Sequence, residues 1–61
     1  MSNTKLKAQR QKTGLTQVEV AKQAKITTMS YQRYESGERM PKADTAMLIA
    51  KVLNSTVEEL F

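Results

Sequence analysis

The sequence predicts an all-α domain built from five short helices. Apolar residues recur at helical spacing, and the segments between them carry residues that typically begin or end helices. No stretch alternates apolar and polar side chains cleanly, and no hairpin dipeptide such as Asn-Gly occurs, so no strand is predicted. At 61 residues the chain has room for a single domain, which we assign to residues 1–61.

The first two helices are marked by the residues at their ends. Residues 1–3 are expected to be loose, and a helix over residues 4–12 would end at Gly14, whose missing Cβ suits a left-handed C-cap. Thr16 would open the second helix, because Glu19 three residues later completes the spacing of a capping box. The residues expected on the inner face of this helix are Val20, Ala21 and Ala24.

A break of about three residues, 25–27, separates the second helix from the third. The third helix would begin at Thr27 or Thr28, continue to about residue 36 and stop at Gly37. A loop over residues 38–42, which contains the only proline, follows it.

The fourth and fifth helices complete the predicted domain. A fourth helix over residues 43–53 presents four apolar residues at helical spacing: Ala46, Ile49, Ala50 and Leu53. Thr56 and Glu59 have the spacing of a second capping box, which would open a last helical turn ending at Phe61.

Charge is distributed unevenly along the chain, whose net charge is +4. Residues 1–33 hold seven basic side chains against the single acid Glu19, whereas residues 34–61 hold three basic side chains against five acids. Such a basic half suits a polyanion such as nucleic acid, and an ordinary solvated surface explains it equally well.

Composition argues against several classes of function. The sequence has no cysteine and no histidine, and we expect no metal site, no cofactor and no enzyme activity. It has no glycine-rich phosphate loop, and no apolar run approaches the roughly 20 residues of a membrane span. We therefore expect a soluble cytoplasmic protein without a membrane partner or a small-molecule substrate.

The most informative feature is a helix-turn-helix over residues 16–36. Ala21 is expected where the two helices cross closely, and Ile26 is expected to fill the space beneath the turn. Such a pair can hold one helix against the domain while the next presents its outer face to a groove of DNA.

The motifs in this region resemble those of the lambda-repressor-like family, which is also called the Cro/repressor-type or xenobiotic-response-element family. The matching segments are Leu15-Thr16-Gln17-Val18-Glu19-Val20-Ala21, Ile26-Thr27, Arg33-Tyr34-Glu35-Ser36-Gly37, Pro41, residues 49–54 and residues 58–60. The resemblance covers about residues 4–61. It implies a compact five-helix fold and a bacterial or phage-encoded transcriptional regulator, a repressor that binds operator half-sites of double-stranded DNA through a recognition helix in the major groove.

The resemblance also implies which residues bind DNA: Gln17, Thr27, Thr28, Met29, Gln32, Arg33, Arg39 and Lys42. Gln17 would bind a phosphate and brace the recognition helix. Gln32 and Arg33 would read base edges, because glutamine pairs well with adenine and arginine with guanine.

The remaining candidates have less specific roles. Met29 or the methyl group of Thr28 would meet a thymine methyl, and Thr27 is as much a helix cap as a DNA contact. Arg39 and Lys42 would bind the phosphate backbone. Lys7 and Lys25 are further, weaker candidates for phosphate contacts.

Other positions are expected to serve the fold. The family pattern places Arg10 near Glu35 as a partly buried ion pair, which we treat as structural. Tyr34 is expected in the core, and Tyr31 could lie either in the core or at the surface.

The sequence departs from the family pattern at three positions. Lys25 stands where glycine is common, so the turn either tolerates strain or bends differently. Lys42 replaces a small capping residue, which leaves Asp44 as a substitute, and Ser55 stands where an apolar residue is usual.

We expect the domain to bind DNA as a homodimer, since one short module contacts little DNA. Four apolar residues either form a C-terminal dimer face or complete the core: Leu48, Val52, Val57 and Phe61. The alternative function is that of an antitoxin or another protein-interaction module with the same fold.

Overall fold

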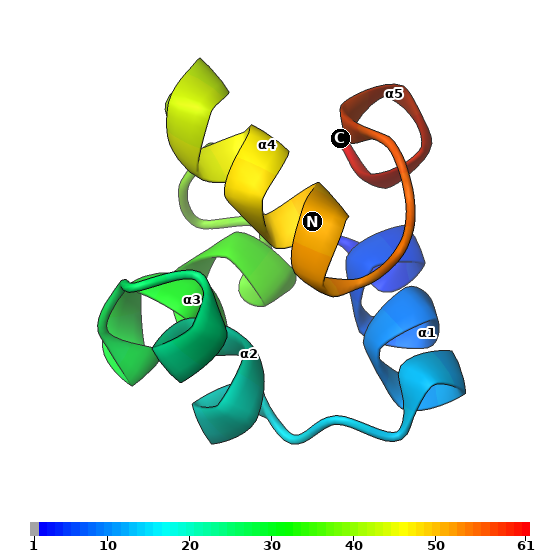
Figure 1. Ribbon diagram of the computed structural model, residues 1–61. Helices are drawn as coiled ribbons and strands as arrows, with labels where there is room; N and C mark the ends of the chain where they lie inside the picture. The colour runs from blue at the N-terminus through cyan, green and yellow to red at the C-terminus, as the bar shows by residue number, and fades with distance from the viewer. Residues whose placement is uncertain (1) are drawn as a thin grey trace.

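The computed structural model describes residues 2–61, and within this range it contains helices and no strand. The helices are α1 (Thr4–Thr13), α2 (Gln17–Gln23), α3 (Thr28–Ser36), α4 (Ala43–Val52) and α5 (Val57–Leu60) (Figure 1). The predicted all-α class is confirmed, and the predicted helices differ from those observed by about one residue at their ends. No helix in residues 2–61 is long and apolar enough to cross a membrane.

The ends of α1, α2 and α3 follow the local chemistry that predicts them. Gly14 and Gly37 adopt left-handed conformations, with φ of 79° and 82°, directly after α1 and α3. The capping box is complete, because the Glu19 amide donates to Thr16 Oγ1 at 3.1 Å and the Thr16 amide donates to Glu19 Oε1 at 2.9 Å. These caps satisfy backbone groups that a short helix leaves without partners.

The second predicted capping box is only half formed. Thr56 Oγ1 accepts a hydrogen bond from the Glu59 amide at 3.2 Å, as predicted. The Glu59 carboxylate, however, accepts from the Thr56 hydroxyl at 3.2 Å and makes no hydrogen bond to its backbone amide. Because the carboxylate is hydrogen-bonded to the Thr56 hydroxyl, only the hydrogen bond from the Glu59 amide caps α5.

The departures from the family pattern have local consequences. Lys25 takes the left-handed conformation, with φ of 60°, so the turn between α2 and α3 keeps its shape and tolerates the strain. Lys42 makes no side-chain cap at the start of α4. Asp44 does not replace that cap, because its Oδ1 accepts only from the amide of the next residue, Thr45, at 2.9 Å.

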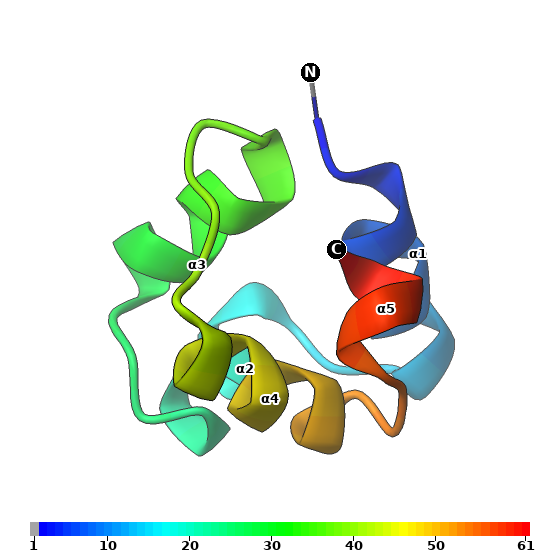
Figure 2. The same ribbon diagram turned by 90° about the horizontal axis from the view of Figure 1, so that it is seen from above.

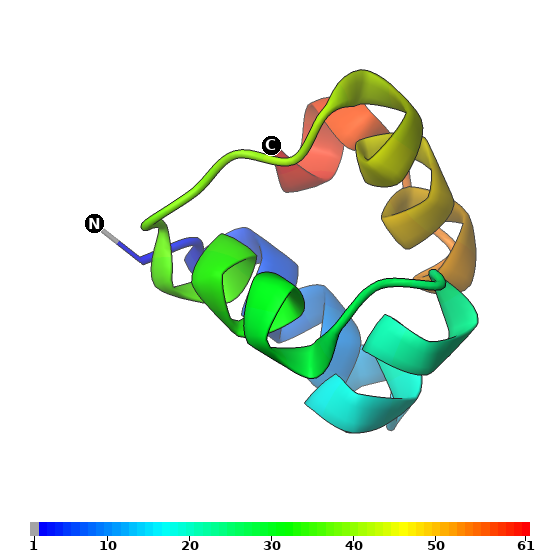
Figure 3. The same cartoon turned by 90° about the vertical axis from the view of Figure 1, so that its left-hand side faces the viewer.

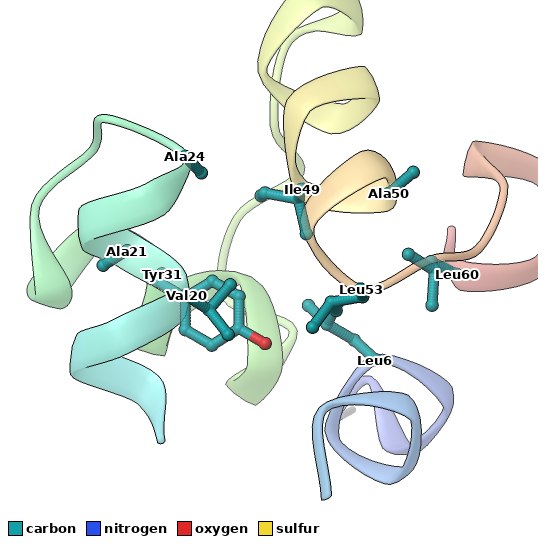
Figure 4. Packing of buried hydrophobic residues seen from close by; sticks show 9 residues of the cluster. All are labelled: Leu6, Val20, Ala21, Ala24, Tyr31, Ile49, Ala50, Leu53 and Leu60. Carbon is teal, nitrogen blue, oxygen red and sulfur yellow. The ribbon is translucent and has the colours of Figure 1, made fainter. Parts of the chain in front are cut away.

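The helices enclose one core (Figure 4), which consists of Leu6, Val20, Ala21, Ala24, Tyr31, Ile49, Ala50, Leu53 and Leu60. α2 packs against α3 and α4, whereas α1 packs against α3 and α5, and α4 also packs against α5. Seen from above, α1 and α5 lie together on one side and α3 lies on the other (Figure 2).

This core settles the open placement of one tyrosine and revises the expected placement of the other. Tyr31 is fully buried, whereas Tyr34, which we expected in the core, is only partly buried against it. Tyr31 and Glu35 are four residues apart on α3 and therefore lie on one face of that helix. This face points inward.

Hydrogen bonds from the N-terminal segment connect α1 to the other helices. The Asn3 amide donates to the Glu35 carbonyl at 2.7 Å, and Asn3 Nδ2 donates to the Leu60 carbonyl at 2.7 Å. Gln9 Nε2 donates to the Leu53 carbonyl at 2.8 Å. The prediction that residues 1–3 are loose is therefore wrong for Asn3, which also caps α1, while Met1 lies outside the described residues.

Candidate nucleic-acid interface

The outer face of α3 is open to solvent, whereas its inner face is buried. Met29 is 62% exposed, and Gln32 and Arg33 are exposed as well. Thr28 is half-buried at the start of the same face. In Figure 3, α3 lies at the front of the molecule, with α2 beside it and α1 behind it. The arrangement leaves one side of a polar helix free to enter a groove.

The inner face of α3 is held by an ion pair with α1. Arg10 Nε donates to Glu35 Oε2 at 2.6 Å, and Arg10 Nη2 donates to Glu35 Oε1 at 3.3 Å. The side chains are only 13% and 5% exposed, so the predicted partly buried pair is present. Arg10 Nη1 also donates to the Leu15 carbonyl at 3.0 Å, which connects the pair to the segment before α2.

Electrostatics keep the Glu35 carboxyl ionised. Burial by itself would raise the pKa of Glu35, but Arg10, the neighbouring Tyr31 hydroxyl and Gln17 together outweigh burial, so the pKa lies below its usual value. The hydrogen bond to Glu35 likewise raises the pKa of Arg10. Burial raises the pKa of Tyr31, whose hydroxyl lies beside this pair as a buried polar atom without a hydrogen-bond partner.

Gln17 connects the ion pair to the outer face of α3. Its Nε2 donates to Glu35 Oε1 at 3.1 Å, and its Oε1 accepts a long, weak hydrogen bond from Gln32 Nε2 at 3.4 Å. Glu35 sets the donor-to-acceptor direction of these two hydrogen bonds, because an ionised carboxylate can only accept hydrogen bonds. Gln17 therefore braces α3. The side-chain amide oxygen of Gln32, Oε1, is left without a hydrogen-bond donor.

Thr27 acts as the N-cap of α3. Its Oγ1 accepts from the Ser30 amide at 3.1 Å, and its hydroxyl donates to Ser30 Oγ at 2.9 Å. The exposed side chain thus uses its donor within the protein, so a direct contact to DNA would come from its methyl group or its remaining lone pair. The capping role of Thr27 is observed, and its contact with DNA stays a prediction.

The loop after α3 begins at a defined position relative to that helix. The Arg33 carbonyl accepts from the Glu38 amide at 3.0 Å and from the Arg39 amide at 3.3 Å. The side chains of Arg39 and Lys42 are exposed. Within residues 2–61, Arg10 is the only cation with an acidic partner within salt-bridge distance, so Arg33, Arg39 and Lys42 are available to an anion.

A surface hollow joins α1 to this region. Lys7 of α1 lines it together with Gln17 and Gln32, so this weaker candidate lies beside the main set. Lys25 is exposed in the turn that precedes α3. Of the eight predicted site residues, Gln17 begins α2, Thr27 caps α3, four lie on α3 and two lie in the loop after it.

Asn3 and Gln9 connect α1 to distant parts of the chain, a role that sequence reasoning missed. The acceptors of both side chains belong to residues far along the chain, at Leu60 and Leu53. Asparagine directly before a helix signals a cap, and Asn3 does cap α1 through Oδ1. No local signal points to its second contact.

Comparison with known proteins gives two matches. A family model described as Helix-turn-helix matches residues 6–60. The transcriptional repressor RstR of cryptic phage CTXphi, from Vibrio cholerae serotype O1, is 36% identical over 56 residues. The match covers 92% of this chain and 50% of that relative, so the chain spans half of the relative's length. No solved structure matches.

Proposed function

Because the chain belongs to the helix-turn-helix family, as its resemblance to the lambda-repressor-like proteins predicts, we propose that it is a sequence-specific DNA-binding repressor of transcription. Its ligand is double-stranded DNA, with α3 lying in the major groove. The observation that carries the proposal is the division of α3 into two faces. Arg10 and Gln17 hold the inner face at Glu35, while the outer face is exposed and, within residues 2–61, its cation has no acidic partner.

The side chains of the outer face have the chemistry that base recognition requires. Arg33 suits guanine, and the free carbonyl oxygen of Gln32 suits a base that donates, such as adenine through N6. Met29 and the methyl group of Thr28 suit a thymine methyl. Thr27, at the start of the helix, adds its own methyl group to this face.

Phosphate contacts come from residues around α3. Gln17 has one amide hydrogen that makes no hydrogen bond in the protein, and Arg39 and Lys42 lie in the following loop. A net charge of +4 favours the approach to a polyanion and makes binding dependent on salt.

The proposal extends to the setting in which the chain works. The relative named as a phage transcriptional repressor supports a bacterial or phage-encoded protein in the cytoplasm. A module of this size contacts few base pairs, so tight binding calls for a homodimer on paired half-sites.

Selection from random double-stranded DNA followed by binding measurements tests the proposal. Arg33→Ala is expected to weaken binding to the selected site about 10- to 100-fold, the cost of one bidentate base contact, and to weaken random-site binding much less. Arg39→Ala should weaken both kinds of site equally and lower the salt dependence. Lys12→Ala removes the same charge at a position without an assigned contact and serves as the control.

Two results would contradict the proposal or part of it. Equal losses on both kinds of site for Arg33→Ala would make Arg33 a backbone contact. Failure of the wild-type chain to select any sequence, together with a tightly bound protein that co-purifies, would favour the protein-interaction module.

A further inference from the structure

The outward face of α4 carries a short pattern of exposed residues. Ala46, Ile49 and Ala50 point into the core. On the opposite side, Met47 and Leu48 are 64% and 44% exposed. Asp44 and Lys51, which are also exposed, complete this stripe, and within residues 2–61 neither has an ionic partner.

The stripe is self-complementary when its direction is reversed. Asp44 stands three positions before Met47, and Lys51 stands three positions after Leu48. When two copies of the stripe run in opposite directions, each apolar residue therefore faces an apolar residue of the other copy. Each acid likewise faces a base. Asp44 and Lys51 are about 10 Å apart along their own helix, so they cannot neutralise each other within one chain.

We propose that this stripe of Asp44, Met47, Leu48 and Lys51 binds the same stripe of a second copy of the chain in an antiparallel, two-fold symmetric pair. Met47 packs against the partner's Leu48, and Asp44 lies against the partner's Lys51, each contact occurring twice. A two-fold interface requires a surface that complements itself, and a stripe with charges of opposite sign at mirrored positions meets that requirement. The inference rests on the dimer of the proposed function and assigns it a surface.

The burial of the other candidates supports this choice. Val52, Val57 and Phe61, which could have formed a dimer face, are partly buried and pack against the core. Leu48 is the one member of that set that remains exposed. The C-terminal face is therefore largely used by the fold, whereas α4 carries two neighbouring exposed apolar side chains, Met47 and Leu48.

The interface is small, so the association is weak without DNA. Binding to two adjacent half-sites would bring the two copies together and favour the pair. A two-fold axis relates the two α3 helices, and a selected operator should accordingly contain inverted half-sites.

A charge-swap series measured by sedimentation up to millimolar concentration tests the pairing. Asp44→Lys and Lys51→Asp each create like-charge contacts twice in the interface, and each should raise the Kd of the dimer at least about tenfold. The double variant D44K/K51D restores both contacts and should return the Kd to within about threefold of the wild-type value. Glu58→Lys changes the net charge as Asp44→Lys does, but on α5, and should leave the Kd unchanged.

The double swap also separates association from folding. An acid near the start of α4 and a base near its end both favour the helix dipole, so each reversal weakens the helix and the double variant combines both effects. If the double variant dimerises again, better folding cannot be the cause. Circular dichroism would monitor the folding of each variant. Met47→Lys should abolish the dimer, whereas Met40→Lys, at a loop residue that is 72% exposed, should not.

The results that would overturn the pairing differ from those that would overturn the proposed function. A double swap that dimerises as poorly as the single variants refutes the α4 pairing, as does a wild-type chain that stays monomeric and binds two half-sites independently. In either case, specific binding to one isolated half-site would leave the proposed function standing. A wild-type chain that shows no specific binding to any half-site would contradict the proposed function instead.

Discussion

Replacing Arg10 with methionine should destabilise the domain by about 3 kcal/mol at pH 7, because it removes one partner of a mostly buried ion pair. Methionine keeps the length of the stem and loses three hydrogen bonds, two to Glu35 and one to the Leu15 carbonyl. Removing one partner of a fully buried pair costs about 3–5 kcal/mol, and the 13% exposure of Arg10 places this pair at the lower end. Gln17 remains to donate to Glu35, which also limits the loss.

A loss of this size is large for so small a domain. A chain of 61 residues has a free energy of unfolding of roughly 3–9 kcal/mol. The expected fall in Tm is about 12–24 °C, since each kcal/mol shifts the Tm of such a domain by roughly 4–8 °C. Urea unfolding followed by far-ultraviolet circular dichroism, at low temperature where the variant is still folded, measures the change.

The effect should depend on pH in a defined direction. In the wild-type protein the pKa of Glu35 is lower than in the unfolded chain, so its contribution is present above the unfolded pKa and is lost as the pH falls through the folded pKa. Without Arg10, burial dominates and raises the pKa of Glu35 above its unfolded value. The variant then gains stability on acidification, and the difference from the wild type should narrow between pH 7 and about pH 3.

Two comparisons decide whether this reasoning holds. The double variant R10M/E35M should recover much of the loss, because two apolar side chains leave no charge buried without a partner. Lys12→Met alters an exposed neighbour on α1 and should change stability by less than about 0.5 kcal/mol. A loss below about 1 kcal/mol for Arg10→Met, unchanged between pH 7 and pH 3, would mean that solvent screens the pair and would refute the argument.

Two further predictions concern the turn and the crossing of α2 and α3. Lys25→Gly should raise the free energy of unfolding by about 0.5–1 kcal/mol, because glycine relieves the left-handed strain at φ 60° but gives the unfolded chain more freedom. Asn54→Gly should gain less in the same urea titration, since asparagine tolerates its φ of 53°, and an equal gain would argue against relief of strain. Ala21→Leu should cost about 1–3 kcal/mol, because Ala21 is 1% exposed and α2 packs closely against α3. Ala8→Leu, at an exposed position of α1, should stay within about 0.5 kcal/mol in thermal unfolding, and a similar small change at Ala21 would show that the crossing has room.

The helix ends could be predicted from sequence because their causes are local. Gly14 and Gly37 supply a backbone conformation that other residues rarely adopt, and the Thr16 capping box lies within four consecutive residues. Spacing could not fix the details at Thr56 and Glu59, because both the complete and the half-formed box use the same residues. The choice between them depends on which donor the carboxylate meets.

The rotation of α3 could not be predicted from local pattern. Tyr31 and Tyr34 are three residues apart, so either can lie toward the core when the helix turns by a fraction of a revolution. The observed rotation places Glu35 against Arg10 and buries Tyr31. The sequence alone could name the ion pair through the family pattern, but the three-dimensional packing was needed to see which tyrosine accompanies it.

The placement of the candidate residues was predictable from sequence, but the hydrogen bonds among them were not. The exposed set on α3 follows from the family pattern and from helical spacing. The hydrogen bonds between Gln17, Gln32 and Glu35 join side chains of two helices, and such contacts depend on side-chain torsions that spacing does not specify. The second contact of Asn3 with Leu60 crosses nearly the whole chain.

The two ends of α3 are held in different ways, which bears on how it would read DNA. Near its C-terminal end, Glu35 meets Arg10 and Gln17 through its side chain and Asn3 through its carbonyl. The N-terminal end is held by the Thr27 cap and by the turn with its left-handed lysine. It follows that Arg10→Met should weaken recognition as well as folding, although Arg10 is assigned no contact with DNA, because the orientation of α3 depends on the carboxylate that Arg10 holds.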